Sequence, residues 1–449
     1  MTAGPVQSSD DPCCEDAGAP APSGAAPRPP RMWTVDEHRD DVLSGIVPLP
    51  PADLPLLDAQ GCVLAEDAVA ATDLPPFDNS SMDGYALRSG DLPDDTADGS
   101  PAALAVVGDI AAGAGELPEV GAGQAARIMT GAPVPPGADA VAPVEWTDGG
   151  TGTGRPADAM TATAADERVL VLRPVTAGAH IRRRGSDIAA GTTVLTAGTV
   201  LGPAQIGLLA AIGRGTARVR PRPRVAVLST GSELVQPGEP VGPGRIPDSN
   251  SFALAAAARA AGADAIRVGG VPDDADVLRA VLAEQLGAAD LVVTSGGVSV
   301  GAYDVVKEVF DGYGGVDFRR LRMQPGKPQG FGRIGDGPGI PLLALPGNPV
   351  SAYISFELFV RPVIRTMLGA PDVHRPVVRA VCTEALRSPA GRRQFLRGRY
   401  APDGTVTPVG GAGSHLVGAL ALADCLITVP EDTTALPAGS AVDVVLLTD

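Results

Sequence analysis

The chain has 449 residues, a length that predicts two to four domains of about 100 to 200 residues each. Its 52 acidic and 35 basic side chains give a formal charge of -17, which repels the nucleic-acid backbone over most of the surface. The apolar runs are far shorter than the roughly 20 residues that cross a bilayer, and the N-terminus has no charged and apolar leader. We therefore expect a cytoplasmic protein that binds neither nucleic acid nor membrane.

The five cysteines and four histidines are scattered along the chain and form no metal-binding spacing, which argues against a zinc site. Residues 1–31 are rich in Ala, Pro and Gly, so we expect a disordered tail. A helix should follow, because Thr34 and Glu37 have the spacing of a capping box ahead of apolar residues on one face. Short apolar runs with frequent turn signals then predict a β-rich domain up to about residue 171.

From about residue 223, buried strands alternate with helices: "PRVAVLSTGSEL", "DAIRVGGV" and "DLVVTSGG" read as strands, with helical segments between them. Continuous apolar strands in this alternation predict a three-layer α/β domain with a parallel-type sheet covered on both faces. The residues after 370 again show short apolar runs and Gly/Pro turns, so we expect a small C-terminal β domain. The fold class is thus multidomain α/β plus β.

Four polar stretches follow the ends of predicted strands in the α/β domain: "STGSEL", "VPDDAD", "SGGVSVGAYD" and "LPGNPVS". Ligands of open α/β sheets bind at this edge, so we expect the four stretches to meet there. In the third stretch, Gly296, Gly297 and Gly301 free the backbone for close approach, and Ser295 and Ser299 add hydroxyl donors ahead of a helix. The loop is either a phosphate cradle or an ordinary strand-to-helix turn, and the glycines alone do not decide between them.

Acidic side chains cluster at the same strand ends. Glu233, Asp273, Asp274 and Asp304 could hold Mg²⁺ that bridges phosphate oxygens. Asp273 and Asp274 also begin a helix, where acids are favoured as caps, and for that pair alone capping is the better explanation. Lys327 in "RMQPGKPQGFG" is either a partner for an oxyanion or a solvated loop lysine.

Other loops are too polar for a core and too specific in composition for linkers. "LPPFDNSSMDGYALR" and "ARIMTGAPVPPGADAVAPVE" in the β-rich region are typical of functional loops. In "HIRRRGSDIAAG", three adjacent arginines form an anion site or pair with surface acids, the commoner arrangement. In "LPGNPVS", Asn348 and Ser351 either meet an anion or cap a helix.

Seven motifs, in this order, resemble those of the molybdopterin molybdenumtransferases, the MoeA family that includes the gephyrin E domain: "PPFDNSSMDGYA", "RIMTGAPVPPGADAVAPVE", "IRRRGSDI", "LSTGSEL", "TSGGVSVGAYDVVK", "QPGKPQGFG" and "LPGNPVSA". The resemblance covers nearly all of residues 33–449. It implies an enzyme of molybdenum cofactor synthesis, in which adenylylated molybdopterin and molybdate give the molybdenum cofactor and AMP with help from Mg²⁺.

The resemblance also implies four subdomains: an elongated first one from residues 32–65 and 172–222, an inserted β-rich second from 66–171, a molybdopterin-binding α/β third from 223–370, and a β-barrel-like fourth from 371–449. The family is typically homodimeric, with an active cleft where the third subdomain of one chain faces the second of the other. Contact with a molybdopterin adenylyltransferase is a further implied partnership.

Carried onto this sequence, the resemblance gives three sets of site residues. The catalytic set is Asp83, Thr130, Asp187, Asp273 and Asp304. The substrate-binding set is Ser295, Gly296, Gly297, Ser299, Gly301, Lys307, Lys327, Pro346, Gly347, Asn348 and Ser351. The metal set is Glu233, Asp274 and Asp304.

This sequence departs from the family pattern at two positions. Ser186 and Ser232 stand where relatives often carry a carboxylate, which puts the number of bound metal ions in question. Two rival functions share the fold: a molybdopterin adenylyltransferase, which would not need the β-rich and C-terminal regions, and a non-catalytic cofactor-binding or scaffold protein.

Overall fold

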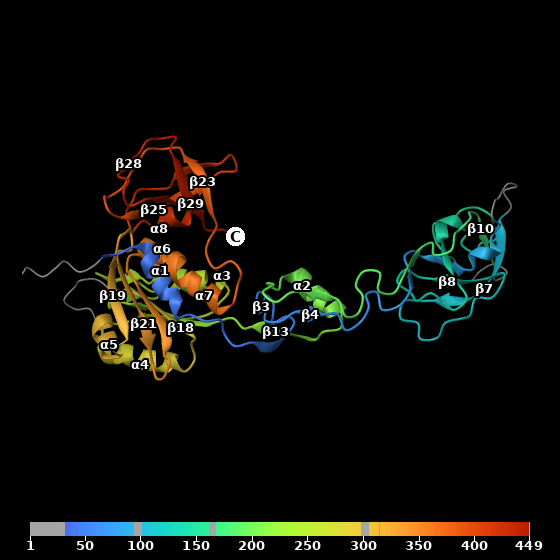
Figure 1. Cartoon of the computed structure of the whole chain (residues 1–449), viewed down its shortest axis with the longest axis horizontal. Coiled ribbons are helices and arrows are strands. Elements are labelled where there is room, and N and C mark those ends of the chain that lie inside the picture. Colours follow the sequence, from blue (N-terminus) through green and yellow to red (C-terminus); the bar gives the residue numbers. More distant parts are fainter. Residues whose placement is uncertain (1–31, 94–100, 161–167, 298–304, 314, 449) are drawn as a thin grey trace, which may run out of the picture.

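The structure is a computed structural model that describes residues 32–93, 101–160, 168–297, 305–313 and 315–448. The expected disordered tail, residues 1–31, lies outside the described residues, as do the predicted site residues Ser299, Gly301 and Asp304. The chain is elongated: an α/β unit carries the C-terminal β unit at one end, a small unit follows, and a β-rich unit lies at the far end (Figure 1).

The α/β unit is built on a seven-stranded sheet in the order β1-β19-β21-β22-β18-β14-β17. Four neighbouring strands, β22, β18, β14 and β17, run parallel, whereas β21 is antiparallel to both of its neighbours. The mostly parallel sheet is confirmed, although its other edge is mixed. The strands are β1 (Met32–Trp33), β14 (Arg224–Thr230), β17 (Asp264–Val271), β18 (Leu291–Ser295), β19 (Val316–Leu321), β21 (Pro328–Ile334) and β22 (Ile340–Leu345).

Alternate side chains of the central strands enter two separate cores, because successive residues of a strand point to opposite faces. Val225 and Val227 belong to one core, and Ala226 and Leu228 belong to the other. The first core contains residues of α1 (Val35–Ser44), α3 (Asn250–Ala260), α6 (Pro349–Ser355), the π-helical turn Phe356–Val360 and α7 (Arg361–Met367). The second contains residues of α4 (Ala275–Leu286) and α5 (Val305–Tyr313). The predicted three-layer arrangement is therefore confirmed.

Local signals set several element boundaries. Thr34 and Glu37 form the predicted capping box at the start of α1, in which the Glu37 N–H donates to Thr34 Oγ1 over 3.1 Å and the Thr34 N–H donates to Glu37 Oε2 over 2.8 Å. The two reciprocal bonds satisfy backbone donors that the first turn of a helix otherwise leaves open.

The C-terminal unit is a closed five-stranded barrel, because β25 pairs with both β26 and β27. Its strands are β23 (Val377–Cys382), β25 (Arg393–Tyr400), β26 (Thr405–Pro408), β27 (Cys425–Val429) and β29 (Ala441–Leu446). The short β20 (Met323–Gln324) comes from the α/β unit and pairs in parallel with the first residues of β25. The minor elements β24 (Leu386–Arg387), β28 (Ala435–Leu436) and α8 (Val417–Ala421) complete the unit.

The β-rich unit holds a five-stranded sheet in the order β10-β7-β8-β6-β9. The strands are β6 (Gly84–Leu87), β7 (Ala102–Ile110), β8 (Gln124–Ile128), β9 (Ala140–Pro143) and β10 (Arg168–Val171), with 3-10 turns at Ser89–Asp91 and Val144–Trp146.

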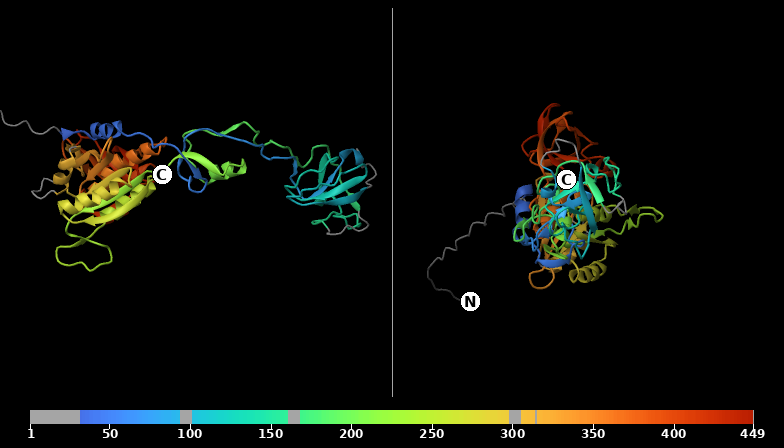
Figure 2. Two further views of the ribbon diagram at one scale, coloured as in Figure 1. Left: turned by 90° about the horizontal axis from the view of Figure 1, so that it is seen from below. Right: turned by 90° about the vertical axis from the view of Figure 1, so that its right-hand side faces the viewer.

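Outgoing and returning segments run side by side between this sheet and the rest of the chain (Figures 1 and 2). They pair as β5 (Asn79–Ser80) with β11 (Ile181–Arg182) and as β4 (Ala68–Val69) with β12 (Thr193–Leu195), with a bridge between Leu74 and Ile188. The small unit lies between the α/β unit and these paired segments (Figure 1). It contains β2 (Ala52–Pro55), β3 (Val63–Leu64), α2 (Pro203–Ala211) and β13 (Thr216–Arg220). Among the described helices, none is long and apolar enough to cross a membrane.

Candidate functional site

A pocket of about 920 Å³ opens at the carboxyl ends of the parallel strands, between the α/β unit and the C-terminal barrel. The strand ends contribute residues 229–231 at the end of β14, 295–297 at the end of β18 and 346–349 just after β22. Because parallel strands end at one edge of a sheet, stretches that are far apart in the sequence meet here. All four of the predicted polar stretches contribute lining residues.

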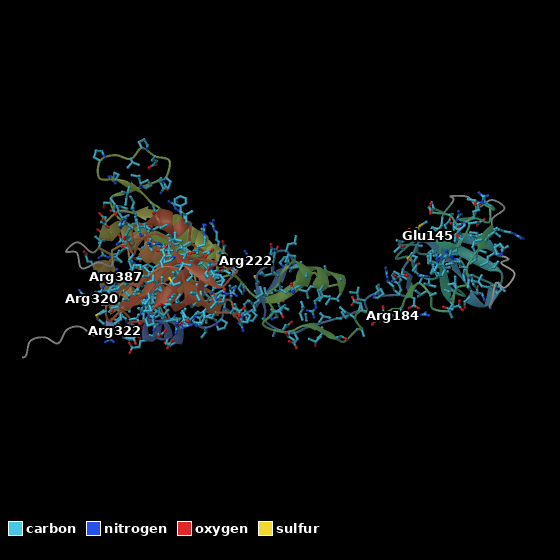
Figure 3. All side chains as sticks on the ribbon, turned by 90° about the horizontal axis from the view of Figure 1, so that it is seen from above. Glu145, Arg184, Arg222, Arg320, Arg322 and Arg387 are labelled. Atoms are coloured by element: carbon cyan, nitrogen blue, oxygen red, sulfur yellow. The ribbon has the colours of Figure 1, made fainter. Side chains whose placement is uncertain are left out.

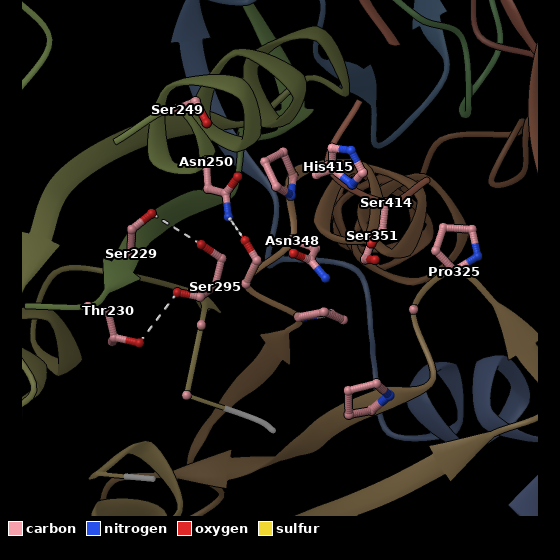
Figure 4. A pocket seen from close by; sticks show the side chains of 18 of the residues that line it. Ser229, Thr230, Ser249, Asn250, Ser295, Pro325, Asn348, Ser351, Ser414 and His415 are labelled. Carbon is pink, nitrogen blue, oxygen red and sulfur yellow. Dashed lines mark hydrogen bonds between the residues drawn. The ribbon is translucent and has the colours of Figure 1, made fainter. Parts of the chain in front are cut away.

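The glycine loop packs directly against the end of β14. The hydroxyls of Ser229 and Ser295 lie 3.1 Å apart, and Thr230 Oγ1 donates to the Ser295 carbonyl over 3.4 Å (Figure 4). Gly296 has φ +100, and a Cβ atom there would lie 2.5 Å from the Thr230 carbonyl oxygen. Only glycine therefore fits this conformation and this close approach.

Three acidic residues line one side of the pocket, Glu233, Asp273 and the almost fully buried Asp248, which is 1% exposed. Asp273 is fixed by a reciprocal pair of bonds: the Ser232 N–H donates to Asp273 Oδ2, and the Asp273 N–H donates to Ser232 Oγ, each over 3.0 Å. The Ser232 hydroxyl thus holds a pocket acid in place. Asp274 is instead the N-cap of α4, since its Oδ1 accepts from the N–H groups of Asp276 and Val277 over 3.0 Å, and it is not among the described residues that line the pocket. The capping explanation therefore fits Asp274, whereas Asp273 is directed to the pocket.

Cationic side chains line the opposite side. Lys327 is half-buried in the pocket wall, and Arg392 donates through Nη1 to Gln324 Oε1 over 3.0 Å. Neither has an ion-pair partner in the described part of the chain. Lys327 precedes β21 and Asp273 follows β17, so four strand spacings, roughly 19 Å, separate the positions of these two residues along the sheet edge. The pocket is electrically polarised along the sheet edge.

The C-terminal barrel supplies pocket residues that sequence reasoning missed: Arg392, Ser414 and His415. In Figure 4, Ser414 and His415 lie beside Ser351 and across the pocket from Thr230. The Ser414 carbonyl accepts from the Val350 N–H over 3.0 Å, which ties the barrel loop to the start of α6. The available signal was the glycine-rich run "GGAGSH" at residues 410–415, which resembles the other loops of the site.

A buried arginine supports this barrel loop from behind. Arg397 is 3% exposed, and it donates to the carbonyls of Gly413, over 3.1 Å, and Gly411. Burial lowers the pKa of Arg397, because no water stabilises its charge. The guanidinium holds the backbone that presents Ser414 and His415.

The remaining substrate-binding predictions at the pocket are partly realised. Pro346, Gly347, Asn348 and Ser351 line it, and Asn250 Nδ2 donates to the Gly347 carbonyl over 2.7 Å. Asn348 is the N-cap residue of α6 but makes no side-chain cap hydrogen bond. Lys307 is not among the described lining residues; its ammonium lies 5.7 Å from the centre of the Phe318 ring.

Asp83 and Thr130 come together, but far from the pocket of the same chain. The Thr130 N–H donates to Asp83 Oδ1 over 2.6 Å, although 47 residues separate the two positions. They lie in the β-rich unit, at the opposite end of the molecule (Figure 1). Asp187 lies on the returning connection, where its N–H donates to the Leu74 carbonyl over 3.0 Å.

Two of the three adjacent arginines pair with surface acids. Arg183 Nη1 lies 2.7 Å from Asp78 Oδ2, and Arg184 Nε lies 2.5 Å from Asp73 Oδ2. A backbone hydrogen bond from Arg184, followed by the Arg183 side chain, lowers the pKa of Asp78. Arg184 points out from the connecting segment in Figure 3. The surface-pairing interpretation therefore fits these two arginines.

The fold and the pocket define an α/β protein of the molybdopterin-binding class. Residues 226–366 match the family "Probable molybdopterin binding domain". Residues 33–213 match the "MoeA N-terminal region (domain I and II)", and residues 379–447 match the "MoeA C-terminal region (domain IV)".

Relatives of known name match over nearly the whole chain. Molybdopterin molybdenumtransferase 2 of Mycobacterium tuberculosis is 46% identical over 420 residues, covering 92% of this chain and 99% of the relative. Molybdopterin molybdenumtransferase 1 of the same organism is 40% identical, covering 93% and 99%. The crystal structure of the molybdopterin biosynthesis MoeA protein from Pyrococcus horikosii is 31% identical with a TM-score of 0.72, and the match covers 93% of this chain and 100% of that one. The chain belongs to the MoeA family of molybdopterin molybdenumtransferases, enzymes of molybdenum cofactor biosynthesis, as its motifs predicted.

Proposed function

We propose that this chain carries out molybdenum insertion in the cytoplasm: adenylylated molybdopterin and molybdate give the molybdenum cofactor and AMP. The observation that carries the proposal is the polarised pocket, in which a phosphate-type glycine loop lies between carboxylates on one side and cations on the other. Such a pocket suits a substrate that is long, anionic along its length and cleaved at a phosphate linkage. The division into four subdomains belongs to the same proposal, and its boundaries near residues 222 and 370 fall between the matched family regions.

The acidic side fits Mg²⁺, which takes oxygen ligands and is usually held by one or two carboxylates together with substrate phosphates. Glu233 and Asp273 would hold it, and Asp273 Oδ1 has no hydrogen-bond donor among the described residues. Bound there, the ion would neutralise charge on the phosphate linkage. The described residues contain no group of three His, Cys, Asp or Glu side chains that could hold a metal ion, so oxygens of the substrate would complete the site. A share of the ion for Asp304 or Asp274 stays a prediction.

Other pocket residues would bind the two substrates. The Gly296 N–H already donates to the Leu345 carbonyl over 3.1 Å, so among the described residues of this loop the backbone N–H of Gly297 would bind the phosphate. Lys327 and Arg392, which have no carboxylate partner in the described chain, would attract molybdate and hold it by charge. Ser351 and Asn348 would orient the ligand between the two sides.

We further propose that the enzyme is a homodimer whose active cleft is shared. The carboxylate of Asp83 accepts a hydrogen bond from the Thr130 N–H. Both residues lie in the β-rich unit, at the end of the molecule remote from the pocket (Figure 1). A second copy could bring its own Asp83 and Thr130 to this pocket. Asp187, on the connection to the β-rich unit, would contribute from the same side.

The test of the reaction incubates purified protein with adenylylated molybdopterin, Mg²⁺ and molybdate, and follows AMP release and reconstitution of a molybdoenzyme. AMP release that requires molybdate is the expected result; its absence, in an assay where a known family member is active, would refute the proposal. Replacing the substrate with molybdopterin and ATP tests the rival adenylyltransferase, for which pyrophosphate release is diagnostic. Any contact with a separate adenylyltransferase that supplies the substrate stays a prediction.

The shared cleft is tested by mixing two inactive variants, Asp83→Ala and Lys327→Ala. If the site is shared, the mixed dimer has one pocket with both residues intact, and activity should return to up to about half of wild type per dimer. Verified mixed dimers that stay inactive would contradict a shared cleft. Two copies of Asp83→Ala serve as the control that mixing itself restores nothing.

A further inference from the structure

One wall of the pocket has little secondary structure of its own. It runs from Ser232 to Asp248 and presents Glu233, Leu234, Ile246, Pro247 and Asp248 to the pocket. Its strands β15 (Leu234–Val235) and β16 (Ile246–Pro247) pair with each other over two residues only. The residues between them form the loop that projects from the α/β unit in Figure 2. Something other than strand pairing must fix the wall.

Arg267, on β17, contacts both ends of this wall. Its Nη2 donates to Gln236 Oε1 over 2.7 Å, just after β15. The same nitrogen lies 3.6 Å from Asp248 Oδ2, just after β16. One guanidinium therefore holds the two ends together.

The same side chain joins the wall to the first turn of α3. Arg267 Nε donates to Ser251 Oγ over 2.8 Å, and the guanidinium carbon lies 3.9 Å from the centre of the Phe252 ring. Asp248 is 1% exposed and accepts from the Ser251 N–H over 3.1 Å, so it is a buried charge that needs this cation. The guanidinium donates hydrogen bonds from its edge and stacks its face on Phe252 at the same time, and a lysine ammonium cannot do both.

The strand is irregular at this point. Val227 pairs with Arg267 and Leu228 pairs with Gly269, which leaves Val268 as an extra residue of a bulge. Gly269 has φ +99, and a Cβ atom there would lie 3.3 Å from Gln236 Nε2. Bulges re-aim a side chain at the edge of a sheet, here the edge strand next to the pocket.

We infer that Arg267 is a positioning residue that fixes the Ser232–Asp248 wall and thereby sets the affinity of the pocket for its substrate. Arg267 itself is not among the described residues that line the pocket, so it acts through Glu233, Ile246 and Asp248. The effect on substrate rests on the function proposed above, whereas the effect on the wall does not.

The experiment compares Arg267→Met and Arg267→Lys with a matched control, Arg259→Met. Arg259 lies on α3 and donates to the Ala265 carbonyl of β17 over 2.9 Å, a bond that reaches neither end of the wall. We expect Arg267→Met to raise KM for adenylylated molybdopterin about tenfold or more and to change kcat less than about threefold. Arg267→Lys should fall between, and Arg259→Met should match wild type.

A second pair of variants leaves the buried Asp248 with its cation, in case Arg267→Met fails to fold. Gln236→Ala removes the acceptor on the wall and should raise KM, whereas Gln236→Glu keeps an acceptor and should restore it. Hydrogen exchange provides a readout that needs no turnover: amides of residues 234–248 should exchange at least about tenfold faster in Arg267→Met and Gln236→Ala.

The outcomes separate the two proposals. A wild-type enzyme without molybdate-dependent AMP release refutes the proposed reaction, while the exchange data still judge the wall. Wild-type KM together with wild-type exchange in Arg267→Met or Gln236→Ala overturns the role of Arg267. Equal defects in Gln236→Ala and Gln236→Glu would also overturn it, because the hydrogen-bond acceptor would then not matter.

Discussion

His38 should make the α/β unit sensitive to mild acid. The side chain lies on α1 with 1% exposure, and its ring meets Phe359 edge-on with centroids 4.7 Å apart. Burial lowers the pKa of His38 to about 4, and the nearby Arg319 adds to the effect while Asp41 opposes it. The folded protein therefore keeps this imidazole neutral at pH values where the unfolded chain protonates it.

The magnitude follows from the difference between the two states. The unfolded pKa is 6.5 and the folded value about 4, a difference worth about 3 kcal/mol once both pKa values have been crossed. Because the folded pKa is lowered, the unfolded state binds the proton first, and stability is lost as pH falls from 6.5 to 4. At pH 5 the loss from this group should be about 2 kcal/mol relative to pH 8.

The assay uses Trp33 as a local reporter, since its ring lies under Arg319 at 4.0 Å and beside α1. The chain has two tryptophans, so a Trp146→Phe background makes this signal unique. Denaturant unfolding at pH 8, 6.5 and 5 is compared between His38 and His38→Leu proteins. The free-energy difference between them should shift by about 2 kcal/mol in favour of His38→Leu from pH 8 to pH 5.

Val42→Ala is the matched control, because Val42 is buried on the same helix and does not titrate. It should lower stability by a similar amount at every pH. If His38→Leu and the parent lose stability in parallel between pH 8 and pH 5, the reasoning is refuted, and His38 must find a charged form in the folded state.

Three further predictions concern packing. Gly296→Ala should weaken binding of AMP with Mg²⁺ by at least about tenfold in calorimetry, because the new Cβ displaces the Thr230 carbonyl and with it the glycine loop; unchanged affinity would contradict the loop's role. Glu357→Gln should lower the free energy of unfolding by about 3 to 5 kcal/mol in a denaturant titration, because it removes the negative charge of a buried ion pair. Glu357 and Arg375 lie 2.9 Å apart, with side chains 2% and 8% exposed. Asp443→Asn removes the charge of an exposed pair with Arg379 and should lower it by less than about 1 kcal/mol. Cys425 should react with thiol reagents at pH 8 at least about 100-fold more slowly in the folded than in the denatured protein, since burial raises its pKa to about 12; equal rates would show that the barrel opens readily.

Features that depend on neighbouring residues could be predicted from the sequence. The capping box at Thr34 needs two side chains three positions apart, and the strand-to-loop junctions at Thr230 and Ser295 need an apolar run followed by glycine. Parallel pairing then brings such junctions together, because it aligns the strand ends. The edge of the sheet at which the pocket lies could thus be predicted from the sequence alone.

Features that depend on distant pairing could not be predicted. Met32 and Trp33 join the sheet beside Arg320 and Leu321, nearly 300 positions away, through a strand of two residues with no periodicity to detect. The barrel closes through β25 and β27, and its loop then reaches the α/β unit at Val350. No local pattern indicated that Arg392 would line the pocket, and for His415 the glycine-rich run at residues 410–415 did not show which unit it would meet.

Asp273 and Asp274 show how far a local rule extends. Both positions suit a helix start, and the rule holds for Asp274, whose Oδ1 accepts two backbone bonds. The neighbouring Asp273 is instead hydrogen-bonded to Ser232, which is 41 positions away in the turn that follows β14. Two adjacent aspartates therefore have different roles, one as a helix cap and one as a pocket acid, and the hydrogen bonds to Ser232 determine which is which.

The bridge between Leu74 and Ile188 has a consequence for engineering the chain. Each of these residues donates its N–H to the other's carbonyl, over 2.7 Å from Leu74 and 3.0 Å from Ile188, so the segment that carries the β-rich unit leaves and re-enters at almost the same point. A short two-residue turn could close that gap, and the whole unit could be excised or exchanged for that of a relative without stretching the remainder. Such a variant would keep all the described pocket residues and lack the β-rich unit, so the contribution of each can be measured separately.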